Sequence, residues 1–287
     1  MVTTRGYGDM GYLARHLPFK EDPSLLLEGV QSAIVVIKNY KNTSQKNLDG
    51  QKKVARYAAG LDYHTVIGAK LQKLEAYIQT QFPEAKSYSG VDSRPLADRS
   101  LALKAGIGFR GKNTMVIRPK VGSYFFIGVI LTTVKFEEDP PFIGTCGTCQ
   151  RCIEACPTQA LSLDGKMDIQ TCISYQTIEK KSPASTHSAY DNQETIKSPA
   201  STHSTTGREG EAPAGSASGG GDASPQLYSW AFGCDICQEV CPFNHVNTPL
   251  TNWAEFLPES GVGFSLQNIQ EIPQNTALYR SRKRLML

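Results

Sequence analysis

The chain has 287 residues, a mass of 31.4 kDa and a formal net charge of +3, so its overall charge indicates no particular partner. Hydrophobic residues make up 40% of the sequence, which suits a buried core in two modest domains or in one domain with an insertion. No run approaches the roughly 18 apolar residues of a membrane span, and the N-terminus has no apolar signal core. These features predict a cytoplasmic protein with no membrane partner.

Residues 1–135 carry strand and helix patterns in alternation. Residues 32–40 form a short, β-branched apolar run, which predicts a buried strand. Residues 62–82 carry apolar side chains at helical spacing and predict an amphipathic helix. The remaining predicted elements are a strand at 85–91, a helix at 94–108 entered through Pro95, and strands at 114–119 and 123–134. This order predicts an α/β domain over residues 1–135.

Residues 136–250 are rich in loops and contain all eight cysteines of the chain. Within them, the segment 182–225 is of low complexity, and the octapeptide KSPASTHS, which begins at Lys181, recurs at 197–204. So few large apolar residues predict a disordered insertion. Residues 251–287 are expected to form a C-terminal tail that packs back on the body.

The cysteines are spaced as metal ligands rather than as a disulfide framework. Disulfides are rare in the cytoplasm, and two four-cysteine zinc sites are an alternative. The first run, however, reads C-x2-C-x2-C-x3-C-P from Cys146 to Pro157, and a second Cys-Pro motif ends at Pro242. That run is typical of bacterial ferredoxins and indicates [4Fe–4S] clusters.

The same motif predicts how the thiols divide between two clusters. In two-cluster ferredoxins the cysteine before the proline binds the other cluster. The first cluster would then be held by Cys146, Cys149, Cys152 and Cys241. The second would take Cys156, Cys234 and Cys237, and Cys172 is the one cysteine left for its fourth position. The residues between Cys172 and Cys234 would loop out at a modest entropic cost.

Several blocks of the chain resemble the epoxyqueuosine reductase family. They include ARYAAGLDYHTVIGAKL, VDSRPLADRSLALKAGIGFRGKNTMVI, GSYFFIGVILT, CGTCQRCIEACPTQAL, CISYQTIE and FGCDICQEVCPFN, in family order. The resemblance implies a reductive-dehalogenase-like α/β corrinoid-binding domain over residues 1–135, followed by a ferredoxin-like module with two [4Fe–4S] clusters over 136–250. It also implies that about thirty N-terminal residues of the family pattern precede the first matching block.

The implied reaction is the reduction of epoxyqueuosine in tRNA to queuosine, the last step of queuosine biosynthesis. The resemblance implies cobalamin as a further cofactor and a tRNA with a GUN anticodon as partner. An unidentified electron donor would feed the clusters, and the protein is expected to be a monomer. Breaking a C–O bond reductively needs a strong electron source, which the cofactors supply, while the protein orients and protonates the substrate.

The resemblance also implies roles for individual residues. Asp92 would donate a proton to the leaving oxygen and lie over the corrin. Arg15, Asn113 and Val116 would lie close to the cobalamin. Lys112 is an alternative to Asn113 for the same contact. From the sequence alone, a cap of the helix that follows is the favoured role of Asp92, and a core position is the favoured role of Val116.

Three other features of the sequence are not predicted to be functional sites. Asp98 is expected to pair with Arg94 or Arg99 and to be structural. His64 lies in a D-x-H pattern typical of a cobalt ligand, but its glycine comes one residue late, so a helical role is favoured. The turn GFRGKN lacks the spacing of a phosphate-binding loop.

Rival functions are left open by the sequence. The chain is alternatively a dicluster electron-transfer protein with an inactive α/β domain, a corrinoid reductive dehalogenase, or a zinc-dependent RNA-binding module. Basic residues at 117–120 and 281–285 are candidates for contact with tRNA phosphates.

Overall fold

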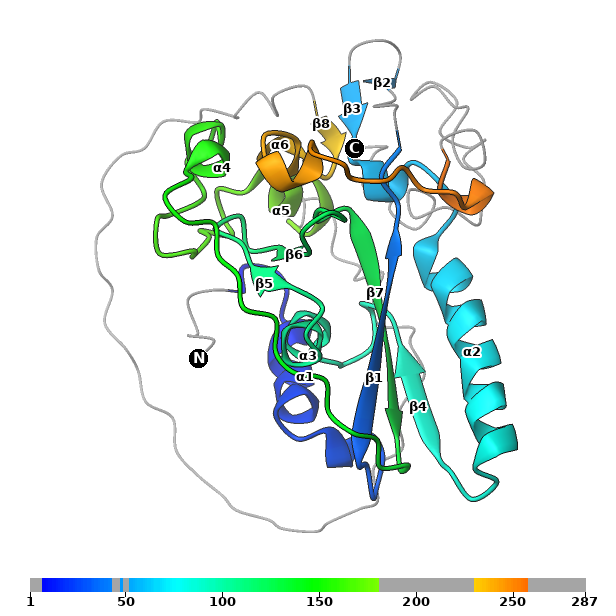
Figure 1. Ribbon diagram of the computed structural model, residues 1–287. Helices are drawn as coiled ribbons and strands as arrows, with labels where there is room; N and C mark the ends of the chain where they lie inside the picture. Colours follow the sequence, from blue (N-terminus) through cyan, green and yellow to red (C-terminus); the bar gives the residue numbers. More distant parts are fainter. Residues whose placement is uncertain (1–6, 43–46, 49–51, 181–229, 258–287) are drawn as a thin grey trace, which may run out of the picture. The chain divides into compact units, whose positions relative to one another are not determined.

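The computed structural model describes residues 7–42, 47–48, 52–180 and 230–257 (Figure 1). The predicted disordered insertion at 182–225 and the basic segment at 281–285 lie outside these residues. Within the described part, eight β-strands and six α-helices pack around several clusters of buried apolar residues.

The main sheet has three strands in the order β1 (Ser32–Asn39), β7 (Phe125–Thr132) and β4 (Ser87–Gly90). Both pairings with β7 are antiparallel, and Ser32 and Ser87 each lie opposite Thr132. The predictions of these three strands are confirmed. β7 is the central strand and is covered on both faces. Seven of its eight residues are therefore buried, which explains why its sequence is an almost continuous run of apolar residues.

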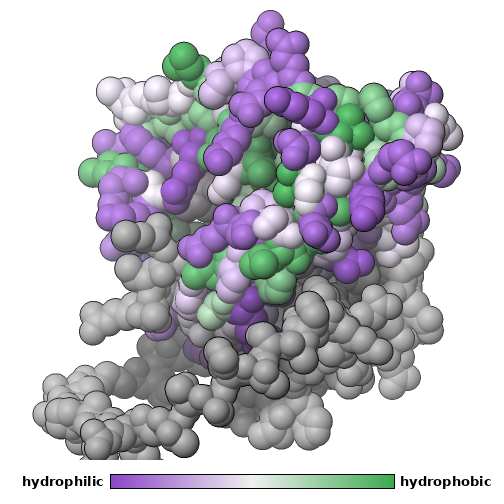
Figure 2. Space-filling model, turned by 90° about the horizontal axis from the view of Figure 1, so that it is seen from below, coloured by the Kyte–Doolittle hydropathy of each residue, from purple (hydrophilic) through white to green (hydrophobic). Residues whose placement is uncertain are grey.

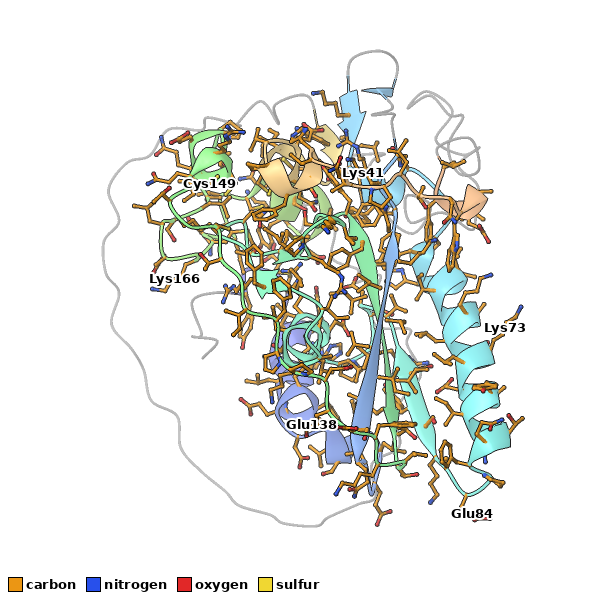
Figure 3. All side chains as sticks on the ribbon, in the orientation of Figure 1. Lys41, Lys73, Glu84, Glu138, Cys149 and Lys166 are labelled. Carbon is orange, nitrogen blue, oxygen red and sulfur yellow. The ribbon has the colours of Figure 1, made fainter. Side chains whose placement is uncertain are left out.

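One face of the sheet is covered by α2 (Tyr63–Gln81), which confirms the predicted amphipathic helix. Its N-cap is Asp62, whose carboxylate accepts a hydrogen bond from the backbone of His64. Ile67 and Leu71 pack on β7 at Gly128, where a Cβ would lie 3.0 Å from Leu71 Cδ2. The glycine therefore lets the helix approach the strand closely, while Lys73 on the outer face points away from the sheet (Figure 3).

The opposite face packs against α3 (Asp98–Lys104), beside α1 (Tyr12–Glu21) and the 3-10 helix η1 (Pro23–Leu25) (Figure 1). The predicted helix at 94–108 is therefore shorter than expected and begins at Asp98. The dihedral angles of its N-cap, Ala97, are not helical, and Leu96 instead packs into the core against Val129. Since Ala97 is the N-cap, the alternative role of Asp92 as the cap is wrong.

The remaining elements are short. The predicted strand at 114–119 is reduced to β6 (Val116–Ile117), which forms a hairpin with β5 (Phe109–Arg110). A second sheet has the order β2 (Asn47–Leu48), β3 (Lys52–Val54) and β8 (Trp230–Phe232). The short helices are η2 (Arg56–Ala58), α4 (Arg151–Glu154), α5 (Ile173–Ile178), α6 (Ile236–Glu239), η3 (Pro242–Asn244) and η4 (Ala254–Phe256).

Polar contacts join the cysteine-bearing elements to the strands of the main sheet. Asp235 is 1% exposed, accepts a hydrogen bond of 2.7 Å from the backbone of Arg56, and lies 3.5 Å from its guanidinium. Ser123, just before β7, donates to Gln238 and accepts from Asn244, at 2.9 Å each. The parallel pairing of β3 with β8 adds a backbone connection between the same two parts of the sequence.

On the face seen from below, apolar residues are interspersed among polar ones (Figure 2). Among the described residues, no helix is both long enough and apolar enough to span a membrane.

Candidate functional site

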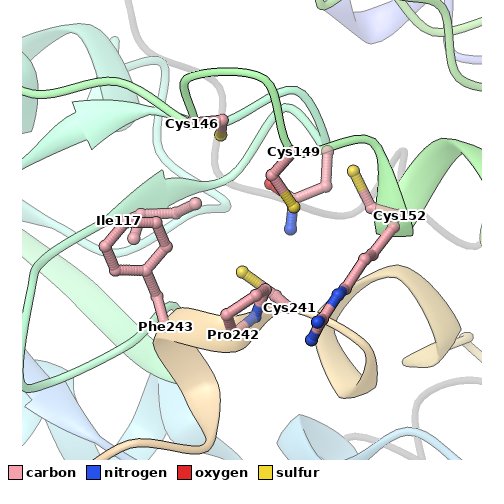
Figure 4. A pocket seen from close by; sticks show the side chains of 9 residues that line it. Ile117, Cys146, Cys149, Cys152, Cys241, Pro242 and Phe243 are labelled. Atoms are coloured by element: carbon pink, nitrogen blue, oxygen red, sulfur yellow. The ribbon is translucent and has the colours of Figure 1, made fainter.

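Four thiols from both ends of the cysteine-rich region surround one cavity (Figure 4). Cys152 lies in α4, and Cys241 directly precedes η3, so two separate chain segments meet here. Ile117 and Phe243 form part of the apolar lining of the cavity. The residues brought together are those predicted for the first cluster: Cys146, Cys149, Cys152 and Cys241.

The other four thiols act on one another electrostatically. Burial raises the pKa of Cys234 to about 12, with further increases from Asp235, Cys172 and Cys156. Burial also raises the pKa of Cys237, and Cys234, Cys172, Asp235 and, from the first group, Cys152 add to that effect. Cys172 is the N-cap of α5, which packs against β8, and this packing brings it toward Cys234 after the long excursion of the chain.

The donor set fits two four-iron clusters. All eight cysteines are free thiols, and four of them line one cavity. Together with the C-x2-C-x2-C-x3-C-P spacing, eight thiols supply the ligands that two four-iron clusters need.

The turn of the β5–β6 hairpin touches both groups of thiols. The backbone N–H of Lys112 donates to Cys146 Sγ at 3.4 Å, and its ammonium donates to Gly147 O at 2.9 Å and Cys149 O at 3.0 Å. Asn113 is 3% exposed, lines the first cavity and donates to Cys237 O at 3.4 Å. The predicted cobalamin contact Asn113 therefore lies against the cysteines in this structure.

A second polar constellation forms where β4 ends beside the start of α2. Asp92 has a left-handed backbone with φ of 46°, and its side chain is 69% exposed. Tyr63 Oη donates to Asp92 Oδ2 at 2.6 Å, and His64 Nε2 lies 3.7 Å from the same oxygen. The other ring nitrogen, His64 Nδ1, lies 2.8 Å from Asp62 Oδ1. Asp92 is thus an open carboxylate held by a phenol and an imidazole.

The electrostatics place a proton on His64 rather than on Asp92 in this conformation. Burial lowers the pKa of His64, but the hydrogen bond with Asp62 and the nearby Asp92 carboxylate outweigh it and the pKa is raised overall. Partial loss of hydration would raise the pKa of Asp92, but the nearby His64 ring and the hydrogen bond from Tyr63 outweigh it and lower the pKa. Two carboxylates around one imidazole therefore favour imidazolium.

Asp98 is a neighbouring carboxyl group with a different character. Its Oδ1 is buried with no hydrogen-bond partner in the described part of the chain. Burial and the charge of Asp92 raise the pKa of Asp98 to about 7. The expected pairing with Arg94 or Arg99 is wrong, because Arg94 lies over the Tyr88 ring and Arg99 donates to Thr114 O.

Aromatic packing fixes the position of the Tyr63 phenol. The ring is 7% exposed and stacks on Phe126 of β7, with centroids 4.3 Å apart and planes within 6°. Tyr57 packs edge-on against it at 6.1 Å. Since Tyr63 is locked by this packing, its hydroxyl is preorganised toward Asp92.

The roles of Tyr63 and His64 were not predicted from the sequence. The available signal was the Asp62-Tyr63-His64 triplet at a helix N-terminus, where Asp62 bonds both the backbone and the ring of His64. Because both ring nitrogens face carboxylates, the geometry also supports the expectation that His64 does not ligate cobalt.

The two remaining predicted cofactor contacts lie in different environments. Arg15 is on α1 and is exposed. Val116 is 4% exposed and packs against Ala102 and Phe125, as an ordinary core residue would. The structure does not bring Arg15, Val116 and Asp92 into direct contact within the described residues.

Comparison with known proteins relates both parts of the chain to one family. Residues 20–93 match the family model described as "Epoxyqueuosine reductase QueG, DUF1730", and residues 145–199 match a 4Fe-4S double cluster binding domain. A curated epoxyqueuosine reductase of Cyclobacterium marinum is 35% identical over 88% of this chain and 71% of its own length. One from Cellulophaga algicola is 34% identical over 84% of this chain. The chain spans about two thirds of the length of the curated relatives, 67% and 66% for the first two.

Solved structures give the same relationship. An epoxyqueuosine reductase crystallised with an epoxyqueuosine-modified tRNA-Tyr stem loop has a TM-score of 0.69 and 25% identity, covering 99% of this chain and 73% of that one. The enzyme of Streptococcus thermophilus has a TM-score of 0.65 and 26% identity, covering 98% and 73%. A third structure, of the Bacillus subtilis enzyme, has a TM-score of 0.65 and 25% identity, covering 99% of this chain and 73% of that one. In that structure an aspartate-bearing catalytic loop is swung out of the active site. With a mixed α/β fold and a double-cluster motif in common with these proteins, the chain belongs to the epoxyqueuosine reductase family.

Proposed function

We propose that this chain reduces the epoxide of epoxyqueuosine in tRNA to the alkene of queuosine, the last step of queuosine biosynthesis. The observation that carries the proposal is a pair of four-thiol groups in one molecule with an open carboxylate held by a phenol and an imidazole. The thiols suit electron delivery, and the carboxylate set suits proton delivery.

Electron delivery is assigned to two [4Fe–4S] clusters. The first is held by Cys146, Cys149, Cys152 and Cys241. The second is held by Cys156, Cys172, Cys234 and Cys237. The shared cavity of the first group and the mutual electrostatic effects within the second support this division. An electron donor that is not identified here would reduce the clusters.

The second cofactor is cobalamin, bound by residues 1–135 in a reductive-dehalogenase-like manner, with the clusters in residues 136–250 and a tail at 251–287. Asp92 and Arg15 are the contacts that the geometry supports best, because both side chains are open to solvent. Asn113 and Val116 are buried, so the geometry supports them less well as residues that would hold the cofactor. When bound, cobalamin supplies the low-potential electrons that cleave a carbon–oxygen bond.

Conversion of the epoxide to an alkene and water consumes two electrons and two protons. Side chains of this protein would deliver the protons. Asp92 faces solvent and is the group that would protonate the leaving oxygen. His64 Nε2 lies 3.7 Å from Asp92 Oδ2 and is the group that would restore a proton to Asp92, while Tyr63 donates a hydrogen bond that orients the carboxylate. Asp62 keeps the His64 ring in the orientation that this transfer needs.

The substrate proposed is a tRNA with a GUN anticodon, whose modified wobble nucleotide would be exposed for reaction. The relative crystallised with a modified tRNA stem loop supports a substrate of this class. Because such tRNAs are modified in the cytoplasm, we place the protein there, as a monomer.

The test is conversion in a purified system. The protein is loaded anaerobically with iron, sulfide and cobalamin, reduced chemically, and mixed with tRNA that contains epoxyqueuosine. The expected result is queuosine by nucleoside mass spectrometry. Bound clusters without bound cobalamin would instead favour the dicluster electron-transfer protein, and cobalamin binding without conversion would favour another corrinoid reaction.

A further inference from the structure

Lys112 is the residue that links the β5–β6 hairpin to the loop of the first thiol group. Its backbone N–H points at Cys146 Sγ, and its ammonium bridges the carbonyl oxygens of Gly147 and Cys149, at 2.9 and 3.0 Å. Two of these three residues are thiol-bearing members of the first group. The positive charge is therefore fixed against the loop that carries the thiols.

This charge is not neutralised by a carboxylate. In the described part of the chain, Lys112 forms no ion pair, and its side chain is half-buried. Arg56, whose backbone N–H donates to the Asp235 side chain next to Cys234, differs in this respect. Arg56 lies 3.5 Å from Asp235 and 2.9 Å from Glu239, so two carboxylates offset its charge.

Charge next to a cluster changes its reduction potential in a known direction. Reduction adds one negative charge to the cluster, and a nearby cation stabilises the reduced form. A backbone N–H donor to a thiolate sulfur acts in the same direction. The first group receives both contributions from Lys112. The second group has a backbone donor of its own, since the N–H of Ala160 donates to Cys156 Sγ at 3.3 Å, so the difference between the groups lies in the charge of Lys112.

We propose that Lys112 is a positioning residue that raises the reduction potential of the first cluster relative to the second. The inference rests on the proposed division of the eight thiols between two clusters. It makes the first cluster the easier one to reduce and leaves the second as the stronger reductant, so the hairpin orders the two steps of electron transfer.

The experiment is a reduction-potential titration of both clusters, followed by EPR, in the protein loaded with its clusters. Two variants remove the charge, Lys112→Gln and Lys112→Met, and Lys112→Arg keeps it. Lys73→Gln, on the outer face of α2, is the matched control. Loss of the charge is expected to disfavour reduction of the first cluster by about tenfold or more, which is about 59 mV for one electron. The potential of the second cluster is expected to stay unchanged in every variant. In Lys112→Arg and Lys73→Gln, the potential of the first cluster is expected to stay unchanged as well.

Unchanged potentials in Lys112→Gln or Lys112→Met, with both clusters bound, would overturn the inference. So would equal shifts of the two clusters. If both charge-free variants lose the first cluster while Lys112→Arg keeps it at its original potential, the role of Lys112 is structural and the inference fails. Iron and sulfide analysis separately measures how many clusters the unaltered protein binds. Failure to bind two clusters would overturn the proposed thiol assignment instead.

Discussion

At the scale of single residues, the proposed chemistry depends on where protons are held. Asp92 is exposed and its pKa is lowered, the pKa of the neighbouring His64 is raised, and Tyr63 donates a hydrogen bond to Asp92. The left-handed backbone of Asp92, with φ of 46°, is tolerated by aspartate better than by most residues. Its position is therefore maintained by hydrogen bonds rather than by regular secondary structure.

Replacement of Asp92 by Asn tests the acid directly. Asn keeps the shape of the side chain but cannot be restored to an acid by His64. We expect turnover to fall by about 10²- to 10⁴-fold, the usual contribution of a general acid. Single-turnover assays measure the loss, and the absorption spectrum checks that cobalamin still binds. Asp164→Asn, at an exposed site paired with Lys166, is the control. Near-normal turnover in Asp92→Asn would remove it as the acid.

The raised pKa of Asp98 predicts that the stability of the folded protein depends on pH. Burial raises its pKa from 3.8 to about 7, so the folded protein binds a proton that the unfolded chain has released in this range. Stability contributed by the protonated carboxyl is therefore present at low pH and is lost as the pH rises toward 7. Because each pKa unit corresponds to about 1.4 kcal/mol, Asp98→Asn should reduce the stability difference between pH 5 and pH 8 by roughly 1–3 kcal/mol. Anaerobic urea unfolding at the two pH values measures it, and an unchanged difference would contradict the assigned pKa.

At the scale of elements, local patterns predicted the main sheet and its covering helix. β1, β7 and α2 have long, clear apolar periodicity, so their existence could be predicted from the sequence. The start of α3 could not, because burial of Leu96 against Val129 outweighs the local preference for a helix at Pro95. The pairing of β3 with β8 joins residues far apart in sequence, and no local signal announces it.

Packing of α5 on β8 brings Cys172 toward Cys234. Thr177 of α5 accepts a hydrogen bond of 3.0 Å from the backbone of Gly233, directly before Cys234. Cys172→Ala should therefore remove one ligand of the second cluster and leave the first intact. Iron and sulfide content should fall by half, with one EPR signal retained. Thr171→Ala is the neighbouring control, and retention of both clusters in Cys172→Ala would show that the thiol assignment is wrong.

At the scale of the whole molecule, packed residues link the proposed cluster ligands to the proposed proton-donating set of Tyr63, His64 and Asp92. Arg56 contacts Asp235 and Glu239 on the cysteine-bearing side, and the neighbouring Tyr57 packs on Tyr63. The cysteine spacing alone predicted both thiol groups. The set formed by Tyr63, His64 and Asp92 could not be predicted in the same way, because the turn of the chain after β4 is what brings Asp92 to the start of α2.

Nucleoside mass spectrometry of tRNA from a bacterial strain that lacks its own epoxyqueuosine reductase tests the central claim most directly. The strain is complemented with this chain or with the Asp92→Asn variant. The account predicts that queuosine returns with the unaltered chain, while epoxyqueuosine accumulates with the variant. Persistence of epoxyqueuosine with the unaltered chain, when the purified protein carries both clusters and cobalamin, would contradict the proposed reaction.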